Sequence, residues 1–95
     1  MAEETATYLV RIDGRVQGVW YRAWTKQEAT KRNVAGWVRN RKDGSVEVLI
    51  SGAPSDVEEM LKAFHDGPPA ARVDAVTTET APAPEGTAFE QRPTA

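Results

Sequence analysis

Alternation of apolar and polar positions predicts short strands along much of the chain. Within residues 8–12, the side chains of Tyr8, Val10 and Ile12 share one face, which is the period of a half-buried strand. The pattern and the composition predict five strands: Tyr8–Ile12, Gly36–Asn40, Val46–Ser51, Arg72–Thr80 and Thr87–Arg92. An Asp43-Gly44 pair separates the second strand from the third, and this dipeptide favours a hairpin turn.

Two other segments are predicted to be helices. Tyr21–Asn33 is rich in good helix formers, and Asn33 suits its end because asparagine tolerates left-handed backbone angles. In the second segment, apolar residues recur at helical spacing at Val57, Met60, Leu61 and Phe64. The sequence from Ser55 to Glu58 has the form of a capping box with Ser55 as the N-cap, and Gly-Pro-Pro at 67–69 is expected to end the helix.

The order of these elements predicts the fold class. Strand, helix, strand, hairpin, strand, helix and strand make the βαββαβ pattern of the ferredoxin-like α+β sandwich, an antiparallel sheet with two helices on one face. Residues 1–6 are expected to be a flexible N-terminal tail, and residues 7–95 a single domain. Enzymes, RNA binders and ligand sensors all use this fold, so the fold alone does not determine the function.

Composition narrows the possible functions. The 95 residues include no cysteine, which excludes disulfides, thiolate metal sites and cysteine catalysis. The formal net charge of -2 argues against nucleic-acid binding through a broadly basic surface. The first residues lack an apolar run, and no segment approaches the ~20 apolar residues of a membrane span, so we expect a cytoplasmic protein with no membrane partner.

The positive charges are unevenly distributed. Nine of the 12 lysines and arginines precede position 43: Arg11, Arg15, Arg22, Lys26, Lys31, Arg32, Arg39, Arg41 and Lys42. Two interpretations remain open from charge alone. These residues are either solvated faces of separate elements or part of an electropositive pocket for a small anion.

The stretch Gly14–Arg22 is the strongest candidate for chemistry. It joins a predicted strand to the start of a predicted helix, where unpaired backbone N–H groups and the helix dipole favour an anion. Gly14 and Gly18 allow backbone angles that let successive N–H groups converge. Arg22 would follow in the first turn, and its guanidinium binds phosphate oxygens in a bidentate way. An ordinary turn with a surface arginine is the alternative from spacing alone.

Three motifs identify a resemblance to the acylphosphatase family. Gly14–Arg22 resembles the family signature G-x-V-Q-G-V-x-[FY]-R, with Tyr21 where Phe is more usual. Residues 36–47, Gly-Trp-Val-Arg-Asn-Arg-Lys-Asp-Gly-Ser-Val-Glu, resemble the family pattern G-W-V-R-N-x-x-D-G-x-V-E. Gly67–Val73 is also typical, and the similarity extends from about Tyr8 to Arg92.

The resemblance implies a specific activity and site. The family hydrolyses the carboxyl–phosphate bond of acyl phosphates, with no cofactor and no metal. Arg22 matches the phosphate-binding arginine of the family, and Asn40 matches the asparagine that orients the attacking water. The phosphate cradle corresponds to the backbone of Arg15, Val16, Gln17, Gly18, Val19, Trp20 and Tyr21. Trp20, at a variable position, is expected to line the mouth of the site.

This chemistry explains why few catalytic side chains are evident. The leaving carboxylate has a conjugate-acid pKa near ~4–5, so it needs no general acid. Charge stabilisation and an in-line water suffice. His65, the one histidine, is expected to be structural at the end of the second helix.

Two alternatives from other classes remain. An RNA-recognition module would need aromatic residues on its central strands, where this chain has Leu9, Arg11, Glu47 and Leu49. A non-catalytic anion sensor would have no use for Asn40. We expect an enzyme that acts as a monomer, with inorganic phosphate as product and inhibitor.

Overall fold

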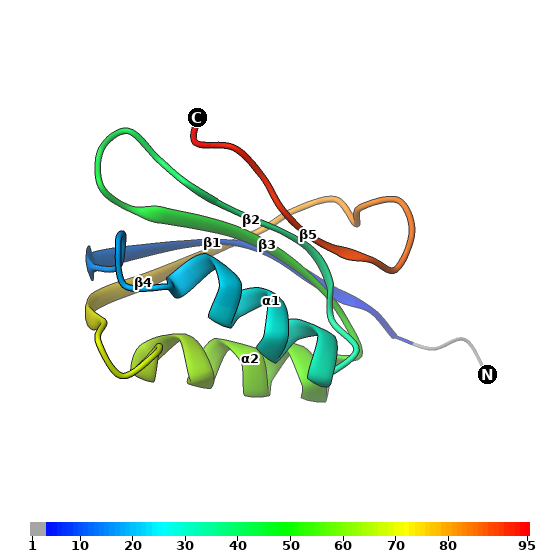
Figure 1. Ribbon diagram of the computed structural model, residues 1–95. Coiled ribbons are helices and arrows are strands. Elements are labelled where there is room, and N and C mark those ends of the chain that lie inside the picture. The colour runs from blue at the N-terminus through cyan, green and yellow to red at the C-terminus, as the bar shows by residue number, and fades with distance from the viewer. Residues whose placement is uncertain (1–3) are drawn as a thin grey trace.

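The computed structural model describes residues 4–95 and shows two layers, a sheet and a pair of helices (Figure 1). The helices are α1 (Tyr21–Lys31) and α2 (Pro54–Asp66). The strands are β1 (Ala6–Arg15), β2 (Ala35–Asn40), β3 (Val46–Gly52), β4 (Arg72–Thr80) and β5 (Phe89–Gln91). The predicted order of elements and the ferredoxin-like fold class are therefore confirmed.

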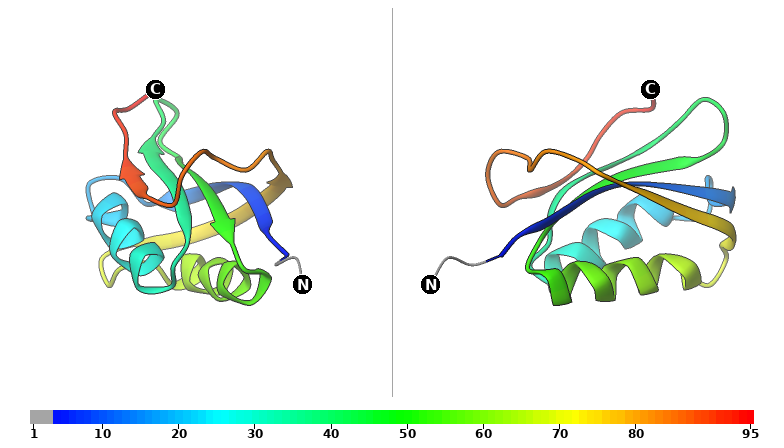
Figure 2. Two further views of the ribbon diagram at one scale, coloured as in Figure 1. Left: turned by 90° about the vertical axis from the view of Figure 1, so that its right-hand side faces the viewer. Right: turned by 180° about the vertical axis from the view of Figure 1, so that it is seen from behind.

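The five strands form one sheet in the order β4-β1-β3-β2-β5. Strand β1 pairs antiparallel with both β3 and β4, and β2 pairs antiparallel with β3. The short β5 pairs parallel with β2, with Gly36 opposite Phe89. The sheet is therefore mixed and not wholly antiparallel as expected, because the connection 81–88 crosses the helix-free side before β5 begins (Figure 2).

Both helices cover one face of the sheet, and the core lies between the two layers (Figure 2). The predicted face of β1 is buried at Val10 and Ile12, and the β3 residues opposite them, Val48 and Val46, are buried too. The apolar stripe of α2 packs onto this surface through Val57, Met60 and Phe64, which are all buried, whereas Leu61 lies at the edge of the core. Burying side chains of this size stabilises the fold by roughly 1.5–3 kcal/mol each.

The start of α2 differs from the sequence prediction. Helix α2 begins at Pro54, with Ala53 as the N-cap, and Ala53 makes no side-chain capping hydrogen bond. The predicted capping box with Ser55 as N-cap is therefore wrong. Proline is favoured at the first helical position because its missing N–H would have no partner there, and this places Ser55 inside the first turn.

The other ends lie close to their predicted positions. Helix α1 ends at Lys31, and Asn33 has a φ of 58°, the left-handed conformation expected of it. The turn between β2 and β3 spans residues 41–45, where Gly44 has a φ of 95°. Strand β1 already begins at Ala6, so only part of the predicted tail precedes it, and residues 1–3 of that tail lie outside the described residues. Within residues 4–95, no helix is long and apolar enough to cross a membrane.

Candidate active site

The loop between β1 and α1 has a backbone conformation that depends on glycine at two positions. Gly14 has a φ of 131°, and a Cβ there would collide with the carbonyl oxygen of Arg72 on the neighbouring β4. The register of β1 against β4 shifts between Asp13 and Gly14, an irregularity typical of a β-bulge, and Gly14 and Arg15 still pair with Val73 and Arg72. Gly18 has a φ of 73° with open space around it, so glycine is favoured there by the backbone angle alone.

Helix α1 presents an uncompensated N-terminus to this loop. Its N-cap, Trp20, is left-handed with a φ of 70° and makes no side-chain capping hydrogen bond. No acidic residue lies in the first turn of α1. The first N–H groups of the helix therefore have no side-chain acceptor from the cap, and no carboxylate neutralises the positive end of the dipole. Such an N-terminus favours a bound anion.

A small cavity of about 150 Å³ opens at this N-terminus. It combines residues of the loop, of the first turn of α1 and of the ends of β2 and β5: Val16, Gly18, Trp20, Tyr21, Arg22, Ala23, Asn40 and Gln91. Arg22 and Asn40, from separate elements, thus line the same cavity. Among the described residues, the Arg22 guanidinium forms no ion pair and no hydrogen bond, and its charge is available to a ligand.

Larger hollows lie elsewhere among the described residues, and neither Arg22 nor Asn40 lines them; the one at the start of α2 is lined by Glu4 and Asp56, whose carboxylates disfavour an anion. One of about 620 Å³ lies between Trp37, Leu49 and the connection 81–88. No helix N-terminus faces it, because both helices cover the other side (Figure 2). The small cavity is therefore the better candidate for anion chemistry despite its size.

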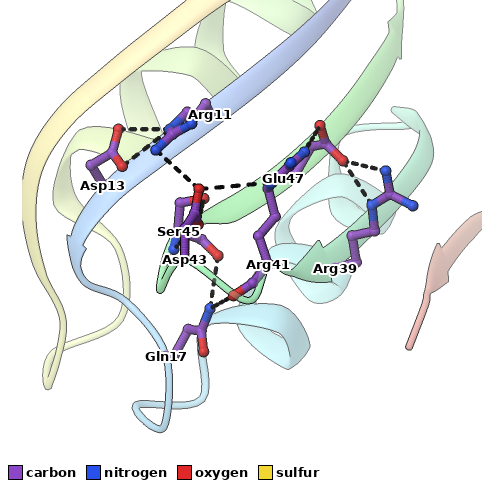
Figure 3. A network of polar contacts seen from close by, with 8 residues as sticks. All are labelled: Arg11, Asp13, Gln17, Arg39, Arg41, Asp43, Ser45 and Glu47. Carbon is purple, nitrogen blue, oxygen red and sulfur yellow. Dashed lines mark hydrogen bonds and ion pairs between the residues drawn. The ribbon is translucent and has the colours of Figure 1, made fainter. Parts of the chain in front are cut away.

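The side chain of Gln17 fastens the loop to the β2–β3 turn. Its amide nitrogen, Nε2, donates to the carbonyl oxygens of Arg41 at 2.7 Å and Ser45 at 2.8 Å (Figure 3). The turn is closed by its own backbone bond from the N–H of Arg41 to the oxygen of Ser45, at 2.9 Å. The amide of Gln17 therefore holds the loop against the turn that directly follows Asn40.

The same turn is ordered by Asp43. One oxygen of its carboxylate accepts hydrogen bonds from the Ser45 hydroxyl at 2.6 Å and the Ser45 N–H at 2.9 Å. These bonds, followed by the charges of Arg11 and Arg41, lower the pKa of the Asp43 carboxyl below its ordinary value. Arg11 approaches the other oxygen at 3.2 Å from β1 (Figure 3). Asp43 thus orders the turn and does not line the cavity.

Two arginines and one glutamate extend this network along the open face of the sheet. The Glu47 carboxylate is largely buried and accepts from Arg39 on one oxygen, at 2.7 Å from Nε, and from Arg41 on the other, at 2.9 Å (Figure 3). Arg39 and Arg41 flank Asn40 in sequence. Their ion pairs hold the main chain on both sides of Asn40, on the face opposite the core.

Tyr21 fixes the first residue of α1 from inside the core. The ring is 2% exposed, and its hydroxyl donates to the carbonyl oxygen of Phe64 at 2.8 Å. Burial raises the pKa of the Tyr21 hydroxyl far above its ordinary value, so the group remains a neutral donor. Because Arg22 is the next residue, this anchor also restricts where the Arg22 side chain leaves the helix.

The predicted site residues occupy different environments. Val16 is buried in the core, and Arg15 is exposed at the end of β1, opposite Arg72. The side chain of Gln17 points to the β2–β3 turn, so only the backbone of this residue remains for a ligand. Arg15, Gln17 and Val19 do not line the cavity, whereas the other predicted residues do.

Two cavity residues were missed by sequence reasoning. Ala23 follows Arg22 and carries no functional group that would have marked it. Gln91 comes from β5, and its place beside Asn40 depends on the parallel pairing of β5 with β2. No local pattern in the sequence indicates that pairing.

Fold and cavity together define a small ferredoxin-like domain with a candidate anion site at a helix N-terminus. The Acylphosphatase family model matches residues 8–91, and the chain belongs to this family. An acylphosphatase of Rhodospirillum rubrum is 53% identical over 87 residues, which cover 92% of this chain and 96% of the relative. An acylphosphatase of Acidovorax sp. is 50% identical over 96 residues, covering 99% of each chain.

Solved structures agree with this assignment. The crystal structure of acylphosphatase from Bacillus subtilis superposes with a TM-score of 0.86 at 36% identity, covering 94% of this chain and 99% of the other. An acylphosphatase from Coxiella burnetii gives a TM-score of 0.88 at 28% identity, with 93% of each chain covered. The chain is thus an enzyme that hydrolyses acyl phosphates, as the motifs implied.

Proposed function

We propose that Arg22 and the backbone amides of residues 15–21 hold the phosphoryl group of an acyl phosphate while Asn40 orients the attacking water. The observation that carries this division of roles is the single cavity that Arg22 and Asn40 share at the N-terminus of α1. The guanidinium and the helix N-terminus both favour negative charge, which spreads over the phosphoryl oxygens in the transition state.

The reaction needs one bond formed and one broken. The water oxygen bonds to phosphorus, the bond from phosphorus to the acyl oxygen breaks, and the carboxylate leaves with the electron pair. The side-chain amide of Asn40 is too weak a base to take a proton, and it acts by holding the water on its line of attack. The proton of the water ends on the phosphate product or in solvent. Since the carboxylate is a stable anion, no acid is required to release it.

Further properties follow from this mechanism. Inorganic phosphate carries the same oxygens as the transferred group, so it should occupy the cradle and inhibit competitively. No step uses a metal or another cofactor, and hydrolysis should persist after exhaustive EDTA treatment. We further propose that the enzyme acts as a cytoplasmic monomer, with no nucleic-acid or membrane partner.

The test compares Arg22→Lys with the wild type on benzoyl phosphate, with and without EDTA. Lysine keeps the charge but loses the planar fork, and loss of one transition-state donor lowers kcat by about 10²–10³-fold. Arg32→Lys, at the other end of α1, is the matched control and should retain wild-type turnover, because Arg32 pairs with Glu28 away from the cavity. Near-wild-type turnover in folded Arg22→Lys, or activity that requires added metal, would refute the mechanism.

A further inference from the structure

The cavity at α1 has room for little beyond a phosphoryl group and a water. Its volume of about 150 Å³ is half the lower end of the roughly 300–1,000 Å³ that pockets for drug-sized ligands span. The groups that favour an anion, the Arg22 side chain and the helix N-terminus, lie at its wall. If the phosphoryl group is held there, as proposed above, the acyl group of the substrate must extend through the mouth.

Trp20 lies at this mouth and is unusual in two ways. It lines the cavity, yet it is 59% exposed, and no other large hydrophobic residue within residues 4–95 is exposed. Its backbone is also left-handed, with a φ of 70°. That conformation suits glycine or asparagine and is an outlier for a bulky side chain. Neither feature stabilises the folded state, because an exposed indole adds little to the core and the left-handed backbone angle is unfavourable for a residue with a Cβ.

Strained residues of this kind concentrate at functional sites, where the surrounding structure holds them in place. Gly18, with a φ of 73°, lies just before Trp20, and the first turn of α1 follows it, so the main chain on both sides of Trp20 is part of the site. A flat, apolar side chain therefore lies beside the cavity from which the acyl group must emerge. Indole offers a large contact area for aromatic and other apolar groups.

We infer that Trp20 forms the wall of an acyl subsite and gives the enzyme a preference for acyl phosphates of aromatic or bulky apolar carboxylic acids over those of small ones. The inference rests on the proposed placement of the phosphoryl group in the cavity. It assigns the selectivity of the enzyme to the side chain of Trp20 and leaves the chemical step to Arg22 and Asn40.

The test measures kcat and KM for benzoyl phosphate and acetyl phosphate with the wild type, Trp20→Gly and Trp20→Phe. Both substrates lose a carboxylate from the same phosphoryl group, and they differ mainly in the size and aromaticity of the acyl group. In Trp20→Gly, the ratio of kcat/KM for benzoyl phosphate to that for acetyl phosphate should fall about 3- to 10-fold, the size of one aromatic contact. The change should come through KM, and Trp20→Phe should keep most of the wild-type ratio.

A second readout excludes an indirect effect on the loop. Glycine and asparagine both suit the left-handed angle, so Trp20→Asn should resemble Trp20→Gly if only the ring matters. The inhibition constants of two non-hydrolysable analogues, phenacylphosphonate and acetonylphosphonate, should shift in the same ratio as the substrates. Trp37→Phe, on the far face of the sheet, controls for loss of an indole elsewhere.

Three results separate the possible failures. An unchanged substrate ratio in Trp20→Gly and Trp20→Asn would overturn the acyl subsite and leave the proposed mechanism standing. An equal loss on both substrates would show that Trp20 only holds the loop, which also overturns the subsite. If the wild type hydrolysed neither substrate, the proposed function itself would fail.

Discussion

The hydroxyl of Tyr21 donates a hydrogen bond of 2.8 Å to the carbonyl oxygen of Phe64 and thereby joins the first turn of α1 to the last turn of α2. Carbonyl groups in the last turn of a helix have no partner within the helix, so this bond satisfies one that the core would otherwise leave buried. Gly67 leaves room for the ring, because a Cβ there would lie 2.8 Å from a ring carbon of Tyr21. The site helix is therefore positioned by a polar contact inside the core.

Replacing Tyr21 by Phe should lower the free energy of unfolding by about 1 kcal/mol, since the ring remains and only a buried hydrogen bond is lost. Denaturant unfolding measures this loss. Tyr8→Phe is the matched control, because among the described residues the hydroxyl of Tyr8 makes no hydrogen bond. Equal loss in both variants would mean that the contact with Phe64 contributes nothing of its own.

The same variant should alter the loss of stability in alkali. Burial raises the pKa of Tyr21 in the folded state above the unfolded value of about 10, so the folded state holds the proton more tightly. The stabilisation is fully present below about pH 10 and is lost as the pH rises from there toward the folded-state pKa. Tyr21→Phe should therefore lose less stability than the wild type between about pH 10 and 11. Parallel pH profiles for the two proteins would contradict this linkage.

Gln17→Met should weaken catalysis more than it weakens the fold. The change keeps the length of the side chain but removes both donors that fasten the loop to the turn after Asn40. We expect kcat to fall at least about 10-fold, since displacements near 1 Å in a positioned site can cost 10². Thr7→Val removes a single 2.8 Å side-chain hydrogen bond to Ser51 at the other end of β1 and is the control. Unchanged kcat in a folded Gln17→Met variant would show that the loop holds its shape without this side chain.

Trp20→Gly should be more stable than Trp20→Ala, although both lack the indole. The left-handed angle costs roughly 1–2 kcal/mol for a residue with a Cβ and almost nothing for glycine. For a domain of this size, about 1 kcal/mol corresponds to a Tm difference of about 4–8 °C. Calorimetry of the two variants tests the strain directly. A lower Tm for Trp20→Gly would show that the backbone at position 20 is not strained.

The extent to which the fold was predictable depended on how local each signal was. Val10 and Ile12 occupy alternating positions of β1, and Val57, Met60 and Phe64 recur at helical spacing. Because each pattern repeats within its own segment, it predicted correctly that these side chains are buried. The start of α2 was predicted wrongly, because Pro54 and Ser55 are both favourable start signals one position apart. Only packing decides between them. The parallel pairing of β5 was also missed, because a strand as short as Phe89–Gln91 carries no information about its partner.

In the candidate site, too, features with a local sequence signal were predicted, and features that depend on contacts between distant segments were not. Arg22 and Asn40 were found through motifs, and the structure places both beside one cavity. The phosphate cradle was expected to use the backbone of Gln17, and no role was predicted for its side-chain amide, which donates hydrogen bonds to carbonyl groups of the turn. Its direction depends on contacts between segments 24 and 28 residues apart, which no local pattern encodes. The left-handed angle of Trp20 was equally invisible, because tryptophan rarely adopts it.

The separation of roles between Arg22 and Asn40 is the central claim, and thermal melting across a phosphate titration tests it most directly. A ligand that binds only the folded state stabilises it by RT ln(1 + [L]/Kd), about 1.4 kcal/mol at ten times Kd, which shifts Tm measurably for a domain of this size.

The wild type, Arg22→Gln and Asn40→Ala are compared, with chloride at matched ionic strength as control. Arg22→Gln should lose most of the phosphate-induced shift, whereas Asn40→Ala should keep the shift and lose turnover. If both variants keep the full shift, phosphate binds elsewhere, and if both lose it equally, Asn40 also binds the anion. Either result would contradict the mechanism.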